Sequence, residues 1–222
     1  MPTALIIGAS RGLGREFTRQ LLSSGWKVYA TARDDAAIDE LSKEGAEALR
    51  VDVTSADSLA GLGWQLDGET LDLAIYVAGA FGSRDDAKSS PTREDFDNVM
   101  HTNVLGAMQA IPLIAPLLEA TRGRFAFISS GMGSIGETDR SYGWVYRASK
   151  AALNMAIKSA ALDYPQAIFV ALSPGWVRTE MGGPNAPTEA DESVRGMLNV
   201  IEGLTAADSG SFRHYSGRTL AW

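Results

Sequence analysis

The fold is decided near the start of the chain, by the stretch Ala4-Leu5-Ile6-Ile7-Gly8-Ala9-Ser10-Arg11-Gly12-Leu13-Gly14. Its first four residues form a short apolar run, typical of a buried parallel strand, and its end opens a helix pattern that stops at Gly25. Glycines between a strand and a helix let the backbone turn tightly and approach a pyrophosphate at the helix N-terminus. The stretch therefore predicts a dinucleotide-binding strand–turn–helix unit.

The same residues also fit a second motif. Gly8-Ala9-Ser10-Arg11-Gly12 matches the Gly-x-Ser-x-Gly turn of α/β-hydrolases, with Ser10 as the nucleophile, and His214 follows in the chain order that a Ser–acid–His triad needs. In hydrolases this turn normally follows several strands, whereas here it follows the first. We therefore favour dinucleotide binding and keep hydrolysis as the alternative.

Apolar runs alternate with helix patterns along the rest of the chain. The further runs lie at residues 27–31, 48–51, 71–77, 124–129 and 168–173, with a weaker one at 211–215 that we expect to be an edge strand. They are continuous rather than alternating, as in parallel strands covered on both faces. Repeated strand–helix–strand units with right-handed crossovers predict an α/β fold with a single doubly wound parallel sheet (Rossmann-type) and one domain over residues 1–222.

Three helix starts are predicted from capping patterns. Thr54-x-x-Asp57 and Thr188-x-x-Asp191 read as capping boxes. Ser90-Pro91 reads as an N-cap followed by proline at the first helical position, and it opens a long helix to about Leu118.

Composition excludes several classes of function. The 222 residues include no cysteine and only two histidines, so disulfides and thiolate zinc sites are excluded and no metal site is expected. The formal net charge is −7 without a basic run, which argues against nucleic acid and anionic membranes as partners. The start of the chain lacks a signal-peptide pattern, and no apolar run approaches about 18 residues. We expect a cytoplasmic protein.

A second informative stretch is Tyr146-Arg147-Ala148-Ser149-Lys150, which opens a helix pattern. Tyr146 and Lys150 are four positions apart and share a helix face, so a phenol and an ammonium point into one site. Ser130 lies sixteen residues upstream of Tyr146, directly after the apolar run 124–129, and Ser129 competes with it for the same role. Asn103 lies further back, on the long predicted helix.

Together with Ala78-Gly79 and Pro174-Gly175, these motifs resemble the short-chain dehydrogenase/reductase family over essentially the whole chain. The finer detail is similar to its C-factor-like carbonyl reductases, through Tyr-Arg-x-Ser-Lys, the stretch 174–184 and a C-terminus ending in Trp222. Two positions depart from the family pattern. Tyr76-Val77 stands where members often have Asn-Asn, and Ile7 stands where many have Thr.

The resemblance implies a catalytic tetrad of Asn103, Ser130, Tyr146 and Lys150. Tyr146 is then the general acid in carbonyl reduction, and Ser130 hydrogen-bonds the substrate oxygen. Lys150 binds the nicotinamide ribose and lowers the pKa of Tyr146. Asn103 holds a water molecule in the proton relay to Lys150.

The resemblance also implies a nicotinamide dinucleotide cofactor. The residues expected to bind it are Gly8, Ser10, Arg11, Gly12, Leu13, Gly14, Arg33, Asp52, Val53, Ala78, Gly79, Tyr146, Lys150, Pro174, Gly175, Val177 and Thr179. The second strand ends at Ala32, without the acid that binds a ribose 2′-hydroxyl, and Arg33 and Arg11 could grip a 2′-phosphate. This favours NADP(H) over NAD(H), although Asp34 or Asp35 could also reach a ribose hydroxyl.

The resulting functional hypothesis is an NADP(H)-dependent oxidoreductase that reduces small aldehydes and ketones or oxidises the alcohols. The alternative is a catalytically idle dinucleotide-binding sensor or interaction protein. We expect the substrate to be selected by the loops 81–87, 131–142 and 178–187, the last of which is a short lid. Family members often associate, so a homo-oligomer is expected.

Overall fold

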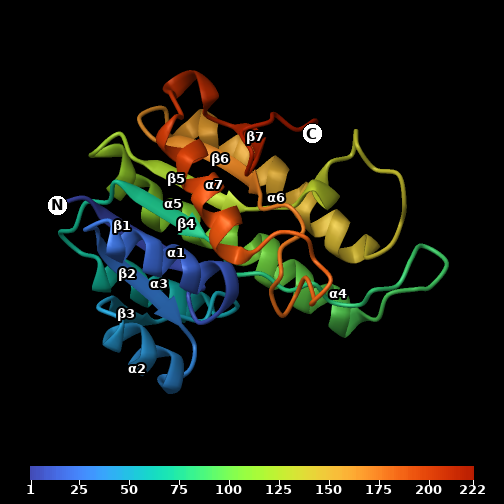
Figure 1. The fold of residues 1–222 in the computed structure, drawn as a ribbon, viewed down its shortest axis with the longest axis horizontal. Coiled ribbons are helices and arrows are strands. Elements are labelled where there is room, and N and C mark those ends of the chain that lie inside the picture. The colour runs from blue at the N-terminus through green and yellow to red at the C-terminus, as the bar shows by residue number, and fades with distance from the viewer.

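Seven parallel strands form one sheet in a computed structural model that describes all 222 residues. The strands lie in the order β3-β2-β1-β4-β5-β6-β7 (Figure 1). They are β1 (Thr3–Ile7), β2 (Lys27–Ala32), β3 (Glu47–Arg50), β4 (Leu73–Tyr76), β5 (Arg124–Ile128), β6 (Ile168–Ser173) and β7 (Ser211–His214). The predicted doubly wound parallel sheet is confirmed, and β7 is its edge strand.

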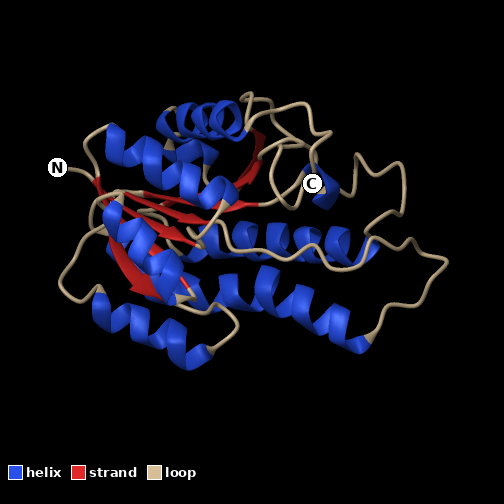
Figure 2. Ribbon diagram, turned by 60° about the horizontal axis from the view of Figure 1, so that its bottom comes forward, coloured by secondary structure: helices blue, strands red, loops and turns tan.

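Helices cover both faces of this sheet (Figure 2). They are α1 (Gly12–Ser23), α2 (Asp35–Lys43), α3 (Ala56–Gln65), α4 (Arg93–Met100), α5 (Gly106–Glu119), α6 (Trp144–Asp163) and α7 (Ala190–Glu202). One buried cluster joins the sheet to α3, α5 and α6, and a second joins it to α1, α2 and α7. None of these helices is both long and apolar enough to cross a bilayer.

The first strand shows why its apolar run is continuous. Leu5 and Ile7 belong to the cluster under α3, α5 and α6, whereas Ala4 and Ile6 belong to the cluster on the opposite face. Successive side chains of a strand point to opposite faces, and both faces here are buried, so every position must be apolar. All five residues of β1 are buried.

The three predicted helix starts are each misplaced. Helix α4 begins two residues later than expected, because the Thr92 hydroxyl, rather than Ser90, accepts the N–H of Asp95. The N-cap of α3 is Ser55, since Thr54 donates its hydroxyl to Asp52 instead. Helix α7 follows Glu189 without a side-chain cap, because Thr188 is engaged in a β-bridge with Val177.

The long helix predicted from Ser90 is interrupted by a wider π-helical turn at His101–Leu105, between α4 and α5. The hydroxyl of Tyr76, at the end of β4, donates a 2.9 Å hydrogen bond to the Thr102 carbonyl of this turn. Gly106 makes room for that hydroxyl. A Cβ at Gly106 would lie 2.6 Å from Tyr76 Oη and 2.6 Å from the Val53 carbonyl oxygen. Thus Tyr76 ties the sheet to the turn that carries Asn103.

Substituting Gly106→Ala should therefore destabilise the protein. The new methyl group would overlap the carbonyl oxygen of Val53, which can move only with the backbone around it. Overpacking of this kind costs about 1–3 kcal/mol. Gly61→Ala is the matched control, because a Cβ at Gly61 in α3 meets nothing within 4 Å. It should stabilise the protein by up to about 1 kcal/mol, since alanine favours the helix. Urea unfolding of both variants tests this, and equal stabilities would contradict the packing argument.

Candidate active site

The predicted site residues gather where the strand order reverses, between β1 and β4. Ligands of open α/β sheets bind outside the carboxyl ends of the strands at such a point. Here the turn after β1 carries Gly8, the segment after β4 carries Ala78-Gly79, and Ser130 follows β5. Pro174-Gly175 follows β6 in the same way. The topology therefore brings together four segments that are far apart in the sequence.

The glycine turn after β1 is tightly packed against the turn after β4. Gly8 has a φ of +95°, and a Cβ there would lie 2.7 Å from the Ala78 nitrogen. A Cβ at Gly14 would lie 2.0 Å from the Gly8 carbonyl oxygen. No side chain caps the first turn of α1, whose N-cap is Arg11. The free N–H groups of that turn suit the pyrophosphate of a dinucleotide, so the residues present fit the expected cofactor.

At the end of β2, the acids that could have favoured a ribose hydroxyl are engaged elsewhere. The Asp34 carboxylate caps α2 by accepting the Ala37 N–H at 2.9 Å, and Asp35 pairs with Arg50. Arg33 is exposed and forms no ion pair. Asp52 accepts two bonds from Thr54, which, with the charge of Arg33, hold the pKa of the carboxyl below its usual range.

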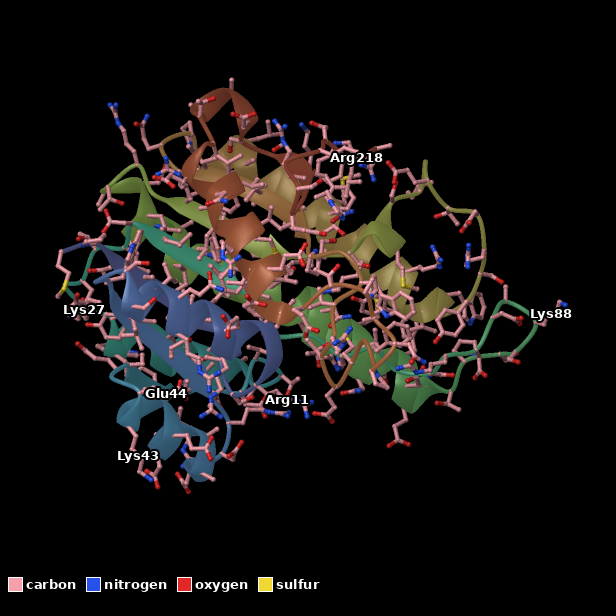
Figure 3. The ribbon with its side chains drawn as sticks, in the orientation of Figure 1. Arg11, Lys27, Lys43, Glu44, Lys88 and Arg218 are labelled. Atoms are coloured by element: carbon pink, nitrogen blue, oxygen red, sulfur yellow. The ribbon has the colours of Figure 1, made fainter.

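The second predicted phosphate-binding arginine, Arg11, forms an exposed ion pair with Glu180 of the expected lid. Figure 3 shows Arg11 beside the segment that leads to α7. Thr179 lies against the same turn, with its methyl carbon 3.7 Å from where a Cβ of Gly12 would be. The lid therefore contacts the glycine turn directly.

Tyr146 and Ser130 meet as the resemblance implies. Tyr146 lies beside the Ser130 side chain, whose proximity offsets part of the effect of burial on the pKa of the phenol, and the Ser130 oxygen accepts the Met132 N–H at 3.1 Å. Ser129 is buried and donates its hydroxyl to Asn154 Oδ1 at 2.6 Å. Ser130, and not Ser129, therefore faces the phenol.

Lys150 and Asn103 are buried beside this pair. Lys150 Nζ donates to the Ile128 carbonyl at 2.8 Å and lies 5.5 Å from the centroid of the Tyr146 ring. Asn103 exchanges two hydrogen bonds with the backbone of Ala80 and donates a third to Ser149 Oγ. A Cβ at Gly79 would lie 3.3 Å from Asn103 Oδ1 and 3.6 Å from Lys150 Nζ. The structure thus brings the four predicted tetrad residues together, with Asn103, Tyr146 and Lys150 buried and Ser130 half-buried.

Burial is the main cause of the pKa shifts of Tyr146 and Lys150. It raises the pKa of Tyr146 to about 12 and lowers the pKa of Lys150 to about 7. The direction for Tyr146 is opposite to the expected lowering by Lys150. The reason is geometric, because Nζ lies over the ring and bonds to Ile128 instead of approaching the hydroxyl. At neutral pH Tyr146 is therefore protonated.

Two residues that sequence reasoning missed shape the surroundings of Tyr146. Phe81 stacks on its ring with centroids 4.5 Å apart. Asn154 anchors the end of β5 by accepting the Ser129 hydroxyl and donating to the Gly133 carbonyl at 3.3 Å. Asn154 could have been found, because it follows Lys150 by four positions and so continues the helix face of Tyr146 and Lys150. The position of Phe81 depends on a loop and carried no such signal.

The hydrolase alternative is wrong. Ser10 follows β1 and His214 ends β7, and three strands lie between them in the sheet. Neighbouring strands are about 4.8 Å apart, so these ends are separated by roughly 19 Å. His214 Nδ1 instead lies 2.9 Å from Ser216 Oγ.

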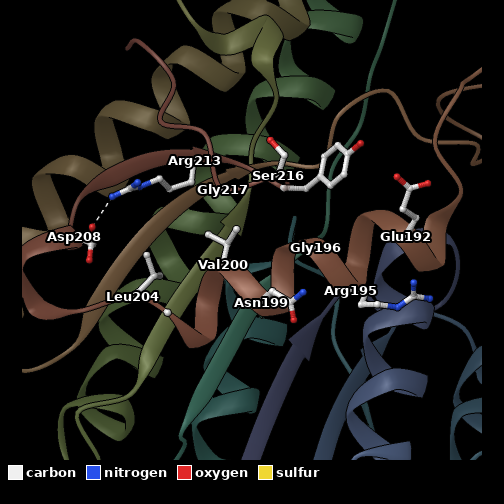
Figure 4. Close-up of a pocket in the computed structure, with 12 residues that line it drawn as sticks. Glu192, Arg195, Gly196, Asn199, Val200, Leu204, Asp208, Arg213, Ser216 and Gly217 are labelled. Carbon is white, nitrogen blue, oxygen red and sulfur yellow. Dashed lines mark hydrogen bonds and ion pairs between the residues drawn. The ribbon is translucent and has the colours of Figure 1, made fainter.

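A cavity of about 580 Å³ lies elsewhere, between α7 and the segment around β7 (Figure 4). None of the predicted site residues lines it. Its arginines are neutralised locally, because Arg213 pairs with Asp208 and Arg195 pairs with Asp191. The structure contains no group of three or more His, Cys, Asp or Glu side chains that could hold a metal ion.

Comparison with known proteins places the chain in a family. The model of the short chain dehydrogenases matches residues 2–190. The C-signal protein of Myxococcus xanthus is 41% identical over 131 residues, which cover 58% of this chain and 79% of that protein. The chain therefore belongs to the short-chain dehydrogenase/reductase family.

Solved structures point to one part of this family. The NADPH-bound carbonyl reductase from chicken fatty liver superposes with a TM-score of 0.90 at 31% identity, covering 100% of this chain and 99% of that one. A short-chain dehydrogenase/reductase from Burkholderia multivorans with bound NADP superposes with a TM-score of 0.88 at 33% identity, covering 100% and 99%. Within its family the protein is close to the carbonyl reductases, as its motifs suggested.

The lowered pKa of Lys150 predicts a pH dependence of stability. Lysine binds its proton in the unfolded chain up to about pH 10.4, but in the folded protein only up to about pH 7. The unfolded state therefore holds more protons between these values, and stability should rise with pH by up to about 1.4 kcal/mol per unit from this group. Urea unfolding of the wild type and of Lys150→Met at pH 7, 8 and 9 measures it. The difference in their free energies of unfolding should increase in favour of the wild type. A constant difference would mean that Lys150 stays charged in the fold.

Proposed function

We propose that this protein is an NADP(H)-dependent carbonyl reductase that reduces small aldehydes and ketones or oxidises the corresponding alcohols. The observation that carries the proposal is that Tyr146 lies beside Ser130, with Lys150 buried on the same helix face as Tyr146. The family relationship and the NADP-bound neighbours support it.

The arrangement suits reduction in particular. The nicotinamide, when bound, supplies a hydride for the carbonyl carbon. Tyr146 donates its hydroxyl proton to the carbonyl oxygen, and Ser130 donates a hydrogen bond to the same oxygen. Tyr146 holds its proton at neutral pH, because burial raises its pKa, and so starts in the form that reduction needs. We assign to Lys150 the nicotinamide ribose and to Asn103 the water molecule through which a proton returns to Tyr146.

Preference for NADP(H) follows from the charges at the end of β2. Arg33 is free of ion pairs, Arg11 has a single exposed partner, and Asp34 and Asp35 are occupied. Arg33 without an acidic partner, together with Arg11, whose one exposed partner Glu180 a phosphate can replace, suits a 2′-phosphate. Asp52 and Val53 are the residues proposed to bind the edge of the adenine ring. Val177 and Thr179 are the residues proposed to contact the cofactor at its nicotinamide end.

The second candidate is the idle dinucleotide-binding sensor, which would not need a Tyr146–Ser130 pair. The two are separated by following NADPH oxidation with a reactive diketone or an aromatic aldehyde, beside a cofactor titration. Turnover supports the reductase, and tight NADPH binding without turnover supports the sensor. A single domain with a lid at residues 178–187, a homo-oligomer and a cytoplasmic location stay predictions.

Cofactor choice is tested with Arg33→Asp. Exchanging an exposed, unpaired cation should change stability by only about 0.5 kcal/mol. Losing a charge-assisted contact should weaken NADPH binding by about 1.5–3 kcal/mol, while NADH binding is kept. Arg93→Asp, an exposed residue at the start of α4, makes the same charge change away from β2 and is the control. Fluorescence titration with both cofactors measures the ratio. An unchanged ratio in Arg33→Asp would show that another group reads the phosphate.

The role of Tyr146 is tested with Tyr146→Phe, which removes only the hydroxyl. Turnover of several carbonyls should fall at least about a hundredfold, because general acid catalysis is worth about that or more. NADPH affinity should stay near that of the wild type. Initial rates and cofactor titration on the same preparation provide both values. More than about a tenth of the wild-type turnover would remove Tyr146 as the acid, and Tyr142 would be examined next.

A further inference from the structure

We propose that Arg84 forms a subsite for an anionic group, such as a carboxylate, on the carbonyl substrate. This inference rests on the proposed function and adds a substrate class to it. Arg84 lies in the loop between β4 and α4, which sequence analysis had singled out only as one of three loops that select the substrate.

Arg84 contacts all three of these loops at once. Its Nη1 donates to the Tyr142 hydroxyl at 2.8 Å, in the loop before α6. Its Nη2 donates to the Met181 carbonyl at 3.1 Å, in the expected lid. Its guanidinium carbon lies 5.0 Å from the centroid of the Phe81 ring. The cation is therefore held in one place by two other segments and by Phe81 of its own loop, although it is exposed.

That place is next to the proposed chemistry. Phe81 contacts both groups, since its ring centroid lies 5.0 Å from the guanidinium carbon of Arg84 and 4.5 Å from the ring centroid of Tyr146. The guanidinium and the ring of the proton donor thus share one aromatic neighbour. A flat substrate whose carbonyl reaches Tyr146 would have its far end near Arg84.

No carboxylate neutralises Arg84. It has no acidic partner within 4 Å, although Asp85 and Asp86 follow it in the chain. Asp85 accepts the Ser83 hydroxyl at 2.5 Å, and Asp86 accepts the Lys88 N–H at 2.9 Å. Arg147, which donates to the Tyr142 carbonyl at 2.9 Å, also lacks an acidic partner. Tyr142 therefore lies between two unpaired cations in a chain whose net charge is −7.

The donors of Arg84 allow a further ligand. A guanidinium carries five N–H donors, and Tyr142 and Met181 use two of them. The three that remain can bind a carboxylate with charge-assisted hydrogen bonds. Because Arg84 and Tyr146 both contact the Phe81 ring, the substrate class is a carbonyl compound with a carboxylate across a ring-sized spacer.

The test compares 4-formylbenzoate with methyl 4-formylbenzoate, which have the same reacting aldehyde and differ in the negative charge. With NADPH, the wild type should show the higher kcat/KM on the carboxylate. In Arg84→Gln the carboxylate-to-ester ratio should fall about tenfold or more, the range for losing a charge-assisted bond, while the ester keeps its rate within about threefold. Arg140→Gln is the matched control, because that neighbouring arginine is already paired with Asp139. It should leave the ratio unchanged.

An unchanged carboxylate-to-ester ratio in Arg84→Gln would overturn the proposal. If both rates fell equally, Arg84 would only hold the loops together. Tyr142→Phe removes one tether and keeps the charge, so the preference for the carboxylate should survive in it.

Calorimetric titration with 4-(hydroxymethyl)benzoate separates this proposal from the proposed function. Binding that weakens about tenfold in Arg84→Gln supports the subsite even if the wild type reduces neither aldehyde. If the wild type binds this ligand but reduces neither aldehyde, the subsite is supported and only the proposed function is rejected. Binding that is the same in both proteins would overturn the subsite even in an active enzyme.

Discussion

The close approach of two backbone turns, after β1 and after β4, is the constraint on which the rest of the site depends. The Ile7 carbonyl accepts N–H bonds from both Val77 and Ala78, at 2.9 and 3.0 Å. Gly8 can lie against Ala78 only because it has no Cβ and adopts a positive φ. This contact leaves the N-terminus of α1 open toward the carboxyl edge of the sheet. It also directs the segment after β4, with Gly79 and Phe81, toward α6. The Tyr76-Val77 departure from the family pattern preserves this arrangement, because the bonds to Ile7 come from the backbone.

Behind that edge, one face of α6 organises the proposed chemistry. Tyr146, Lys150 and Asn154 follow each other at intervals of four residues and are all buried. Each has a different neighbour: Tyr146 lies beside Ser130, Lys150 donates to the carbonyl of the last residue of β5, and Asn154 accepts the Ser129 hydroxyl. Because so many polar groups are satisfied by one another, the end of β5 and the helix are held in a single relative position. The same burial that positions them moves the pKa values of Tyr146 and Lys150 in opposite directions.

In front of that edge, the contacts are made by exposed arginines. Arg11, in the glycine turn, pairs with Glu180. Arg84, in the loop after β4, donates to Met181 in the same segment as Glu180 and to Tyr142 in the loop before α6. Exposed ion pairs and hydrogen bonds contribute little to stability and exchange readily with water or ligand groups. The molecule therefore combines a rigid buried cluster with a mouth whose polar contacts a charged ligand can replace.

The sequence by itself determined the sheet, the glycine turn and the shared helix face of Tyr146 and Lys150, because these depend on local rules, whereas the tetrad as a whole is proposed from the family resemblance. Burial of a strand on both faces forces a continuous apolar run, a tight turn against another backbone demands glycine, and a shared helix face requires a spacing of four. Only the tertiary structure decided what depends on distant segments meeting. Asp34 and Asp35 became unavailable through α2 and Arg50, Ser10 and His214 were separated by three strands, and the pKa of Tyr146 rose because it is buried. The helix caps were misplaced by one or two residues because the structure caps α4 with Thr92, bonds Thr54 to Asp52 and engages Thr188 in a β-bridge with Val177. Arg84 carried no signal at all, since its position is fixed by three loops whose proximity no local pattern encodes.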